Sequence, residues 1–295
     1  MFDFFAYTFG YVLNFIYNII NNYGFAIILF TIFVKLLLLP ISIKQQRTMK
    51  KSAQMQEQVK ALQFKYKNDP QKMNQEMMSL YKAENYSPFS GCLSAIAQII
   101  LLLSVFYLVR SPLTFMKQVP KETIDTYIQQ MKEEGKIQNS AYPEIDIIRE
   151  KGQEDEQVKI NMEFLGLDLS QIPNQNMQDY RVYIIPVLYI ISSVISMKIT
   201  TAMQKQQNTK KKEAVIDVTE KKEGEEGEEN KQVEKEEETP DISMQTNKTM
   251  SWLIPIMAIS IAFVAPLGLA LYWLVNNVLM IVERIALNKF LKDEE

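Results

Sequence analysis

The sequence predicts an all-α, polytopic membrane protein with five transmembrane helices and a helical hairpin in the cytoplasm. Long apolar stretches alternate with highly charged ones along a chain of 295 residues that is 47% hydrophobic. The chain has no histidine and one cysteine, which excludes His-dependent catalysis, HExxH zinc sites, four-cysteine metal sites and an internal disulfide framework. No phosphate-binding loop is present either. We therefore predict no catalytic residue, no metal, no cofactor and no enzymatic activity.

Residues 1–22 are rich in aromatic side chains but interrupted by polar ones such as Asp3 and Asn14. Because aromatic residues prefer the membrane interface, we expect an amphipathic helix lying on the extracytoplasmic surface. A first spanning helix is the alternative. Residues 23–43 are predicted to form the first span, which Pro40 should kink or end.

The polar segment 44–90 predicts an antiparallel helical hairpin. Hydrophobic residues recur at helical spacing from Met55 to Tyr66, and Asp69 followed by Pro70 predicts the start of the second helix. Residues 44–86 hold nine Lys or Arg against four acidic residues. The positive-inside rule therefore places this hairpin in the cytoplasm.

The rest of the chain divides by composition into apolar spans and polar connections. The apolar run 250–287 is too long for one span and contains Pro266, which predicts two helices joined by a tight turn. The Lys/Glu-rich connection after the third span cannot bury a core and is predicted to be disordered. The expected boundaries are the second span at 91–110, an extracytoplasmic loop at 111–180, the third span at 181–203, a cytoplasmic disordered linker at 204–248, the fourth span at 249–266, the fifth at 267–288 and a cytoplasmic tail at 289–295.

Lys35 stands near the middle of the first apolar stretch, about 16 Å of helical rise from its outer end and about 12 Å from its inner end. A cation at that depth costs from ~2.5 to more than ~10 kcal/mol unless water or protein surrounds it. A lysine that extends to the interface is one explanation. We favour a functional cation in a hydrated intramembrane groove, and we expect no acidic partner for Lys35 within a span.

The order of these features resembles the YidC-type membrane protein insertase family, in its Gram-positive-like form with a five-helix core. Residues 23–56 resemble that family's first core helix running into its hairpin, and residues 80–93 its entry into the second helix. Residues 164–170 resemble a short element before the third helix, and residues 266–277 the last hairpin and fifth helix. The resemblance implies a hydrophilic groove open to the cytosol and to lipid, with a cation that is usually arginine and here is Lys35.

The resemblance also implies which side chains line that groove. The uncharged polar candidates, listed below, either line the groove or form hydrogen bonds between helices. Two aromatic candidates either contact the substrate or, as we favour, pack against neighbouring helices. For the hairpin methionines, an adaptable surface for partners competes with a seam between the two helices. The candidates are Lys35, Thr31, Gln98, Ser192, Ser196 and Asn276 for the groove, Tyr272 and Trp273 for a hydrophobic slide, and Met55, Met73 and Met77 for a partner surface.

The function implied by the resemblance is insertion and folding of newly synthesised membrane proteins without nucleotide hydrolysis. The implied location is the bacterial cell membrane, with the N-terminus outside and the C-terminus inside. The implied partners are nascent membrane proteins and lipid, with the Sec translocon, the ribosome and the signal-recognition receptor as candidates, and no DNA. The alternative is a secondary transporter or channel with an intramembrane lysine, and a structural scaffold is a third possibility.

Overall fold

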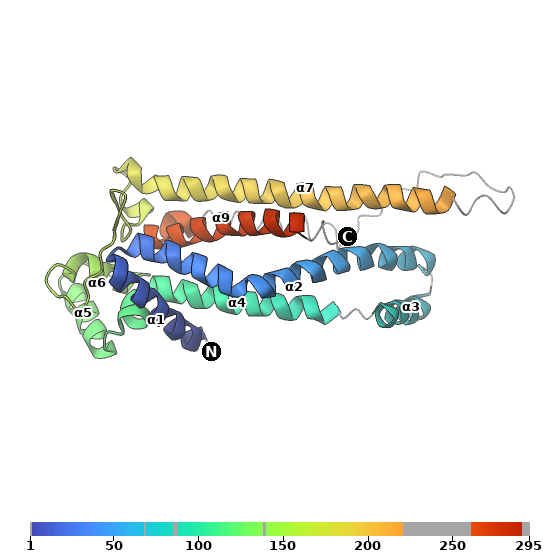
Figure 1. Ribbon diagram of the computed structural model, residues 1–295. Coiled ribbons are helices and arrows are strands. Elements are labelled where there is room, and N and C mark those ends of the chain that lie inside the picture. The colour runs from blue at the N-terminus through green and yellow to red at the C-terminus, as the bar shows by residue number, and fades with distance from the viewer. Residues whose placement is uncertain (1, 68, 85–87, 138–139, 221–260, 291–295) are drawn as a thin grey trace. The chain divides into compact units, whose positions relative to one another are not determined.

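The computed structural model describes residues 2–67, 69–84, 88–137, 140–220 and 261–290 (Figure 1). The described chain is almost entirely helical and divides into two compact units. One unit consists of Met1–Ser170 with Val282–Glu295, and the other of Gln171–Ile281. Each unit is described by itself below.

Within the part of the chain that the structure describes, three helical segments are long and apolar enough to cross a membrane: Tyr23–Thr48, Tyr180–Ala202 and Leu267–Phe290. They confirm the predicted all-α, polytopic class. The expected second span lies within helix α4 (Pro88–Arg110), of which Ile99–Arg110 forms a shorter apolar helix. Much of the expected fourth span lies outside the described residues. The number of five spans therefore stays a prediction.

Helix α1 (Phe2–Ile20) packs against α4 and α2 in the first unit. It buries a stripe that includes Phe9 and Leu13, and it exposes a second apolar stripe that includes Phe15. A helix with apolar side chains on its packed and its open face suits an environment of lipid. Whether α1 lies on the membrane or crosses it stays a prediction.

Helix α2 runs without interruption from Tyr23 to Lys65 and joins the first span to the first helix of the hairpin. The side chain of Asn22 begins it by accepting a hydrogen bond of 3.1 Å from the Phe25 amide. Of the two outcomes expected at Pro40, an end of the helix does not occur, because α2 continues through this residue, and a kink stays a prediction. A proline removes a single helical hydrogen bond, and the flanking turns hold the helix together.

The second hairpin helix, α3 (Pro70–Ala83), begins as predicted. Asp69 accepts a hydrogen bond of 3.0 Å from the Lys72 amide, and Pro70 occupies the first turn. The two hairpin helices contact each other and form an open surface pocket of about 440 Å³, lined by Leu62 and Leu80 among others.

Much of the segment 111–180 is ordered and attached to the first unit. It contains a π-helical turn η1 (Leu113–Lys117), helices α5 (Lys121–Glu133) and α6 (Pro143–Lys151), and antiparallel strands β1 (Glu163–Phe164) and β2 (Leu167–Asp168). Leu165 and Gly166 form the turn between the strands with positive φ angles of 49° and 77°. Two positive φ angles are typical of a tight two-residue hairpin turn.

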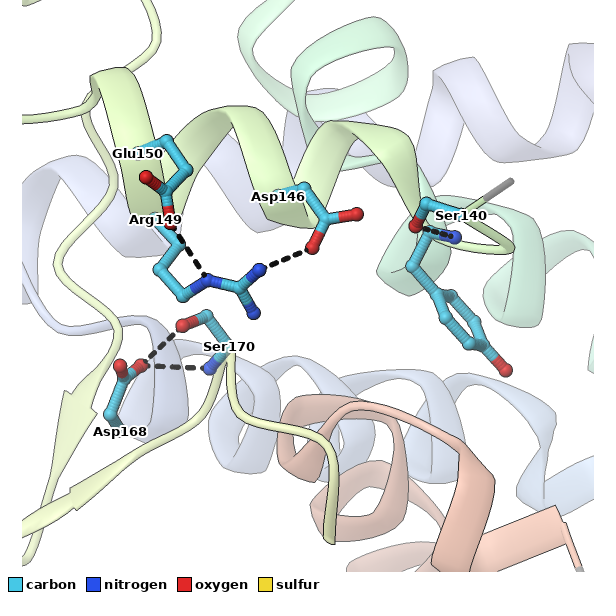
Figure 2. Close-up of polar contacts among 7 residues, drawn as sticks. Ser140, Asp146, Arg149, Glu150, Asp168 and Ser170 are labelled. Carbon is cyan, nitrogen blue, oxygen red and sulfur yellow. Dashed lines mark hydrogen bonds and ion pairs between the residues drawn. The ribbon is translucent and has the colours of Figure 1, made fainter. Parts of the chain in front are cut away.

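Polar contacts organise this segment around α6 (Figure 2). The guanidinium of Arg149 donates to Asp146 at 2.7 Å and to Glu150 at 3.5 Å. In β2, Asp168 accepts hydrogen bonds of 2.9 and 2.7 Å from the amide and hydroxyl of Ser170, which fixes the end of the strand. Asp146 is buried, so Arg149 compensates a carboxylate that water does not reach freely.

Asn161 fastens the same segment to the corner between α1 and α2. Its backbone oxygen accepts a hydrogen bond of 3.0 Å from the Tyr23 amide, and its side chain donates to the Asn21 carbonyl at 2.8 Å. The Tyr17 hydroxyl in turn accepts from the Asn161 amide at 2.8 Å. These bonds fix the position of the first turn of α2. They therefore support the span that carries Lys35.

The second unit contains the 3₁₀ turns η2 (Pro173–Gln175) and η3 (Tyr180–Tyr183), helix α7 (Ile184–Glu220) and most of α9 (Leu267–Phe290). The Leu267 amide donates to the Gln171 carbonyl at 2.9 Å and ties the start of α9 to the start of this unit. Helix α7 extends to Glu220, so it covers the first part of the expected linker. Lys, Gln and Glu are good helix formers and can prolong a helix that the membrane span has already nucleated.

Candidate functional site

Lys35 lies on α2, one turn after Thr31 and on the same side of the helix. Thr31 is buried, and its hydroxyl donates to the Ile27 carbonyl of its own helix at 2.6 Å. Lys35 is partly accessible, with 19% of its side chain exposed. The helix therefore changes from a packed surface around Thr31 to a partly open one at Lys35.

Lys35 forms an ion pair with Glu283 of helix α9. The distance from the lysine Nζ to the glutamate Oε2 is 3.3 Å, and 15% of the Glu283 side chain is exposed. Both residues belong to the first unit. They also lie in candidate spans, since Tyr23–Thr48 contains Lys35 and Leu267–Phe290 contains Glu283. The site is therefore an acid–base pair between two helices apolar enough to cross a membrane.

The expectation that Lys35 has no acidic partner within a span is wrong. Glu283 is the single acidic residue between 267 and 288, and it follows a long apolar run. Charges inside membranes usually pair with one another, so a lone carboxyl in one span and a lone lysine in another was the signal that could have revealed the pair.

Only one of the two carboxylate oxygens of Glu283 takes part in this ion pair. Its second oxygen, Oε1, is buried and has no hydrogen-bond partner among the residues that the structure describes. A buried carboxylate oxygen without a partner loses hydration without compensation. Glu283 is therefore held at Lys35 by one oxygen only.

A second polar cluster lies inside the other unit and joins α7 to α9. The Asn277 side chain donates to the hydroxyls of Ser192 at 2.9 Å and Ser193 at 3.1 Å. Asn277 and Ser192 are buried, whereas the predicted Asn276 is half-buried. Sequence reasoning missed Asn277 because two adjacent asparagines differ only in the direction they face on the helix.

Substituting Asn277 with alanine should lower the free energy of unfolding by about 0.6 to 1.7 kcal/mol, which are the average and the maximum measured for hydrogen bonds between membrane helices. The matched control is Asn276→Ala, which changes the same side chain one position earlier. Denaturant unfolding of both variants in lipid nanodiscs measures the difference. A larger loss in the Asn276 variant would contradict the assignment of Asn277 as the interhelical bridge.

The remaining candidates fall in several environments. Ser196 is buried on α7, and Tyr272 is buried on α9 while Trp273 contacts the Tyr189 ring at a centroid distance of 6.1 Å. The side chain of Gln98 lies outside the described part of α4.

Of the hairpin methionines, Met55 is buried, and Met73 and Met77 are half-buried. The burial of Met55 fits the alternative of a helix seam. Thr31 and Lys35 belong to one unit and Ser192, Ser196 and Asn276 to the other, so a groove that they share stays a prediction.

Helices apolar enough to cross a membrane and an acid–base pair between two of them define a polytopic membrane protein. The chain matches the family of the 60Kd inner membrane protein over residues 15–219 and 225–294, and it belongs to that family. It is 44% identical over 102 residues to a membrane protein insertase YidC of Caldanaerobacter subterraneus, covering 35% of this chain and 50% of the relative.

A second relative, a membrane protein insertase YidC of Treponema denticola, is 26% identical over 283 residues, covering 96% of this chain and 37% of the relative. This chain thus spans half or less of the length of these relatives. The bacterial relatives and the apolar helices place it in a bacterial membrane.

Proposed function

We propose that this protein inserts newly made membrane proteins into a bacterial membrane and helps them to fold. The observation that carries the proposal is the similarity to a membrane protein insertase along 96% of this chain. The paired charges in two apolar helices support it, because a polar site inside a membrane lowers the cost of moving polar segments across.

In this mechanism a polar, often acidic, tail of the substrate enters beside Lys35, and the attached apolar segment moves into lipid. Transfer of the apolar segment into hydrocarbon supplies the driving force, so no covalent step and no nucleotide is required. Each negative charge that moves outward gains ~2.3 kcal/mol per 100 mV of membrane potential. The proposed substrates are therefore nascent membrane proteins with short extracytoplasmic tails.

Orientation and partners form part of the same proposal. The excess of Lys and Arg in residues 44–86 supports a cytoplasmic hairpin, and hence an outer N-terminus and an inner C-terminus. A cytoplasmic hairpin is positioned to meet the ribosome, the signal-recognition receptor or a Sec translocon as a nascent chain arrives.

Lys35→Gln should reduce insertion of an acidic-tailed, single-span substrate by about tenfold, which corresponds to about 1.4 kcal/mol of lost charge stabilisation. Lys35→Arg keeps the charge and should support insertion, and Lys35→Glu should fail. Complementation of a strain depleted of its own insertase, with protease protection of the substrate tail as readout, measures all three. Normal insertion of acidic-tailed substrates by Lys35→Glu would refute a role for the charge.

One observation favours a second function. An acid–base pair between spans is also expected of a secondary transporter or channel. Flux of ions or small solutes through proteoliposomes that contain the purified protein separates the two functions, because an insertase should show no substrate-saturable flux.

A further inference from the structure

We propose that Glu283 is a specificity-determining residue: it occupies Lys35 between insertion events and competes there with the acidic groups of substrate tails. This inference rests on the proposed insertion function and deepens it. It assigns to one carboxylate of α9 the selection among substrate tails by their charge.

The geometry of the pair supports displacement. Charge-assisted N–H···O bonds are usually about 2.7–2.9 Å long, whereas Lys35 and Glu283 are 3.3 Å apart. One carboxylate oxygen makes this contact, and the other is buried without a partner among the described residues. A bidentate, fully hydrogen-bonded carboxylate would be difficult to replace. Glu283 is held by a single long contact.

The chemistry of the setting explains why the position needs a counterion. Lys35 is the single charged residue from 23 to 43, and Glu283 the single acidic residue from 267 to 288. Without a counterion, a lysine in a membrane span is costly, so the pair keeps the resting protein stable. The exposed fractions of 19% and 15% leave both side chains accessible to an entering group.

Competition between Glu283 and the substrate tail for Lys35 then determines how strongly the protein prefers acidic tails. Glu283 is tethered beside Lys35, so its effective concentration there is high, and a neutral tail has no group that takes its place. An acidic tail offers the same carboxylate chemistry and can exchange with Glu283. The carboxylate therefore competes with acidic tails for Lys35 and reduces the advantage that this lysine gives them over neutral tails.

The test compares two substrates in proteoliposomes that contain the full-length protein. They share one apolar segment, and their tails carry either three aspartates or three asparagines. The readout is the ratio of their insertion rates, because a general loss of folded protein lowers both rates equally. Glu283→Gln should raise the acidic-to-neutral ratio by about fivefold or more, since it removes the internal competitor. An unchanged ratio would overturn the inference.

Further variants separate this inference from the proposed function. Lys35→Gln with Glu283→Gln removes both charges of the pair, so neither is left without the other, and should lose the preference for acidic tails. If Lys35→Gln alone leaves the ratio at the wild-type value, the proposed role of Lys35 fails, whatever Glu283 does. Glu156→Gln is the matched control, since Glu156 pairs with Lys159 at 2.6 Å outside the spans, and it should leave the ratio unchanged.

Should Glu283→Gln fail to accumulate, Glu283→Asp takes its place. Aspartate keeps the charge and shortens the side chain by one methylene, which lengthens the ion pair and weakens competition. The ratio should again rise, and a ratio equal to that of the wild type would count against the inference.

Discussion

Glu144→Ala should lower the free energy of unfolding by about 3 kcal/mol. Glu144 is buried on α6, and its Oε2 accepts hydrogen bonds from the amides of Leu113 at 2.8 Å and Thr114 at 3.0 Å. Its Oε1 accepts from the Thr114 hydroxyl at 2.6 Å. Alanine leaves these donors buried without an acceptor. The connection between α6 and the end of α4 should then open.

Glu144→Gln is the matched control, because its amide oxygen can still accept from both backbone N–H groups and its NH₂ can donate to the Thr114 hydroxyl. Thermal unfolding in nanodiscs and limited proteolysis of residues 111–179 measure the two variants. Equal stability of Glu144→Ala and the wild type would contradict a structural role for this carboxyl.

The same carboxyl should make stability depend on pH. Burial raises the pKa of Glu144 above its usual range, against the lowering effect of the hydrogen bonds from Thr114 and Leu113. The folded state therefore holds the proton more tightly than the unfolded chain. Its stabilising contribution is complete below the pKa that the carboxyl has in the unfolded chain and is lost as the pH rises through the higher folded pKa. Glu144→Gln should remove this part of the pH dependence.

Gly10→Ala should destabilise the protein by about 2–3 kcal/mol, although the same change inside a helix normally stabilises by about 0.5–1 kcal/mol. Gly10 lies on α1 where that helix meets the turn η1. A Cβ atom at Gly10 would overlap the Phe115 carbonyl oxygen and lie 2.6 Å from its carbon. A backbone carbonyl cannot rotate away, so α1 would have to shift.

Thr8→Ala provides the comparison, because it places alanine on the exposed face of the same helix. It should change the free energy of unfolding by less than about 0.5 kcal/mol. Denaturant unfolding of both variants in nanodiscs tests the close approach. If Gly10→Ala proves more stable than the wild type, helix propensity outweighs the contact and α1 does not lie against Phe115.

Local signals predicted much of the helical architecture. The apolar runs predicted the spans, and the pair Asp69–Pro70 predicted the start of α3, because capping and hydrophobicity act over a few residues. The end of a span is set less locally: α2 passes through Pro40, and α7 passes beyond the apolar run to Glu220. A helix continues wherever neither solvent nor packing favours ending it.

The candidate site was predicted only in part. Lys35 was identified by its cost in a membrane, which depends on its own helix alone. Glu283 was not recognised as its partner, and Asn276 was chosen where Asn277 makes the contacts with Ser192 and Ser193. Both errors concern which side of α9 a residue faces.

By itself, the sequence determined the helical class of this protein, the spans predicted to begin at residues 23, 181 and 267, and the presence of an expensive cation at Lys35. The tertiary structure alone decided that Glu283 compensates that cation at 3.3 Å. The physical reason is distance along the chain. Hydrophobicity and capping are properties of neighbouring residues, whereas an ion pair across 248 positions depends on how two helices turn toward each other.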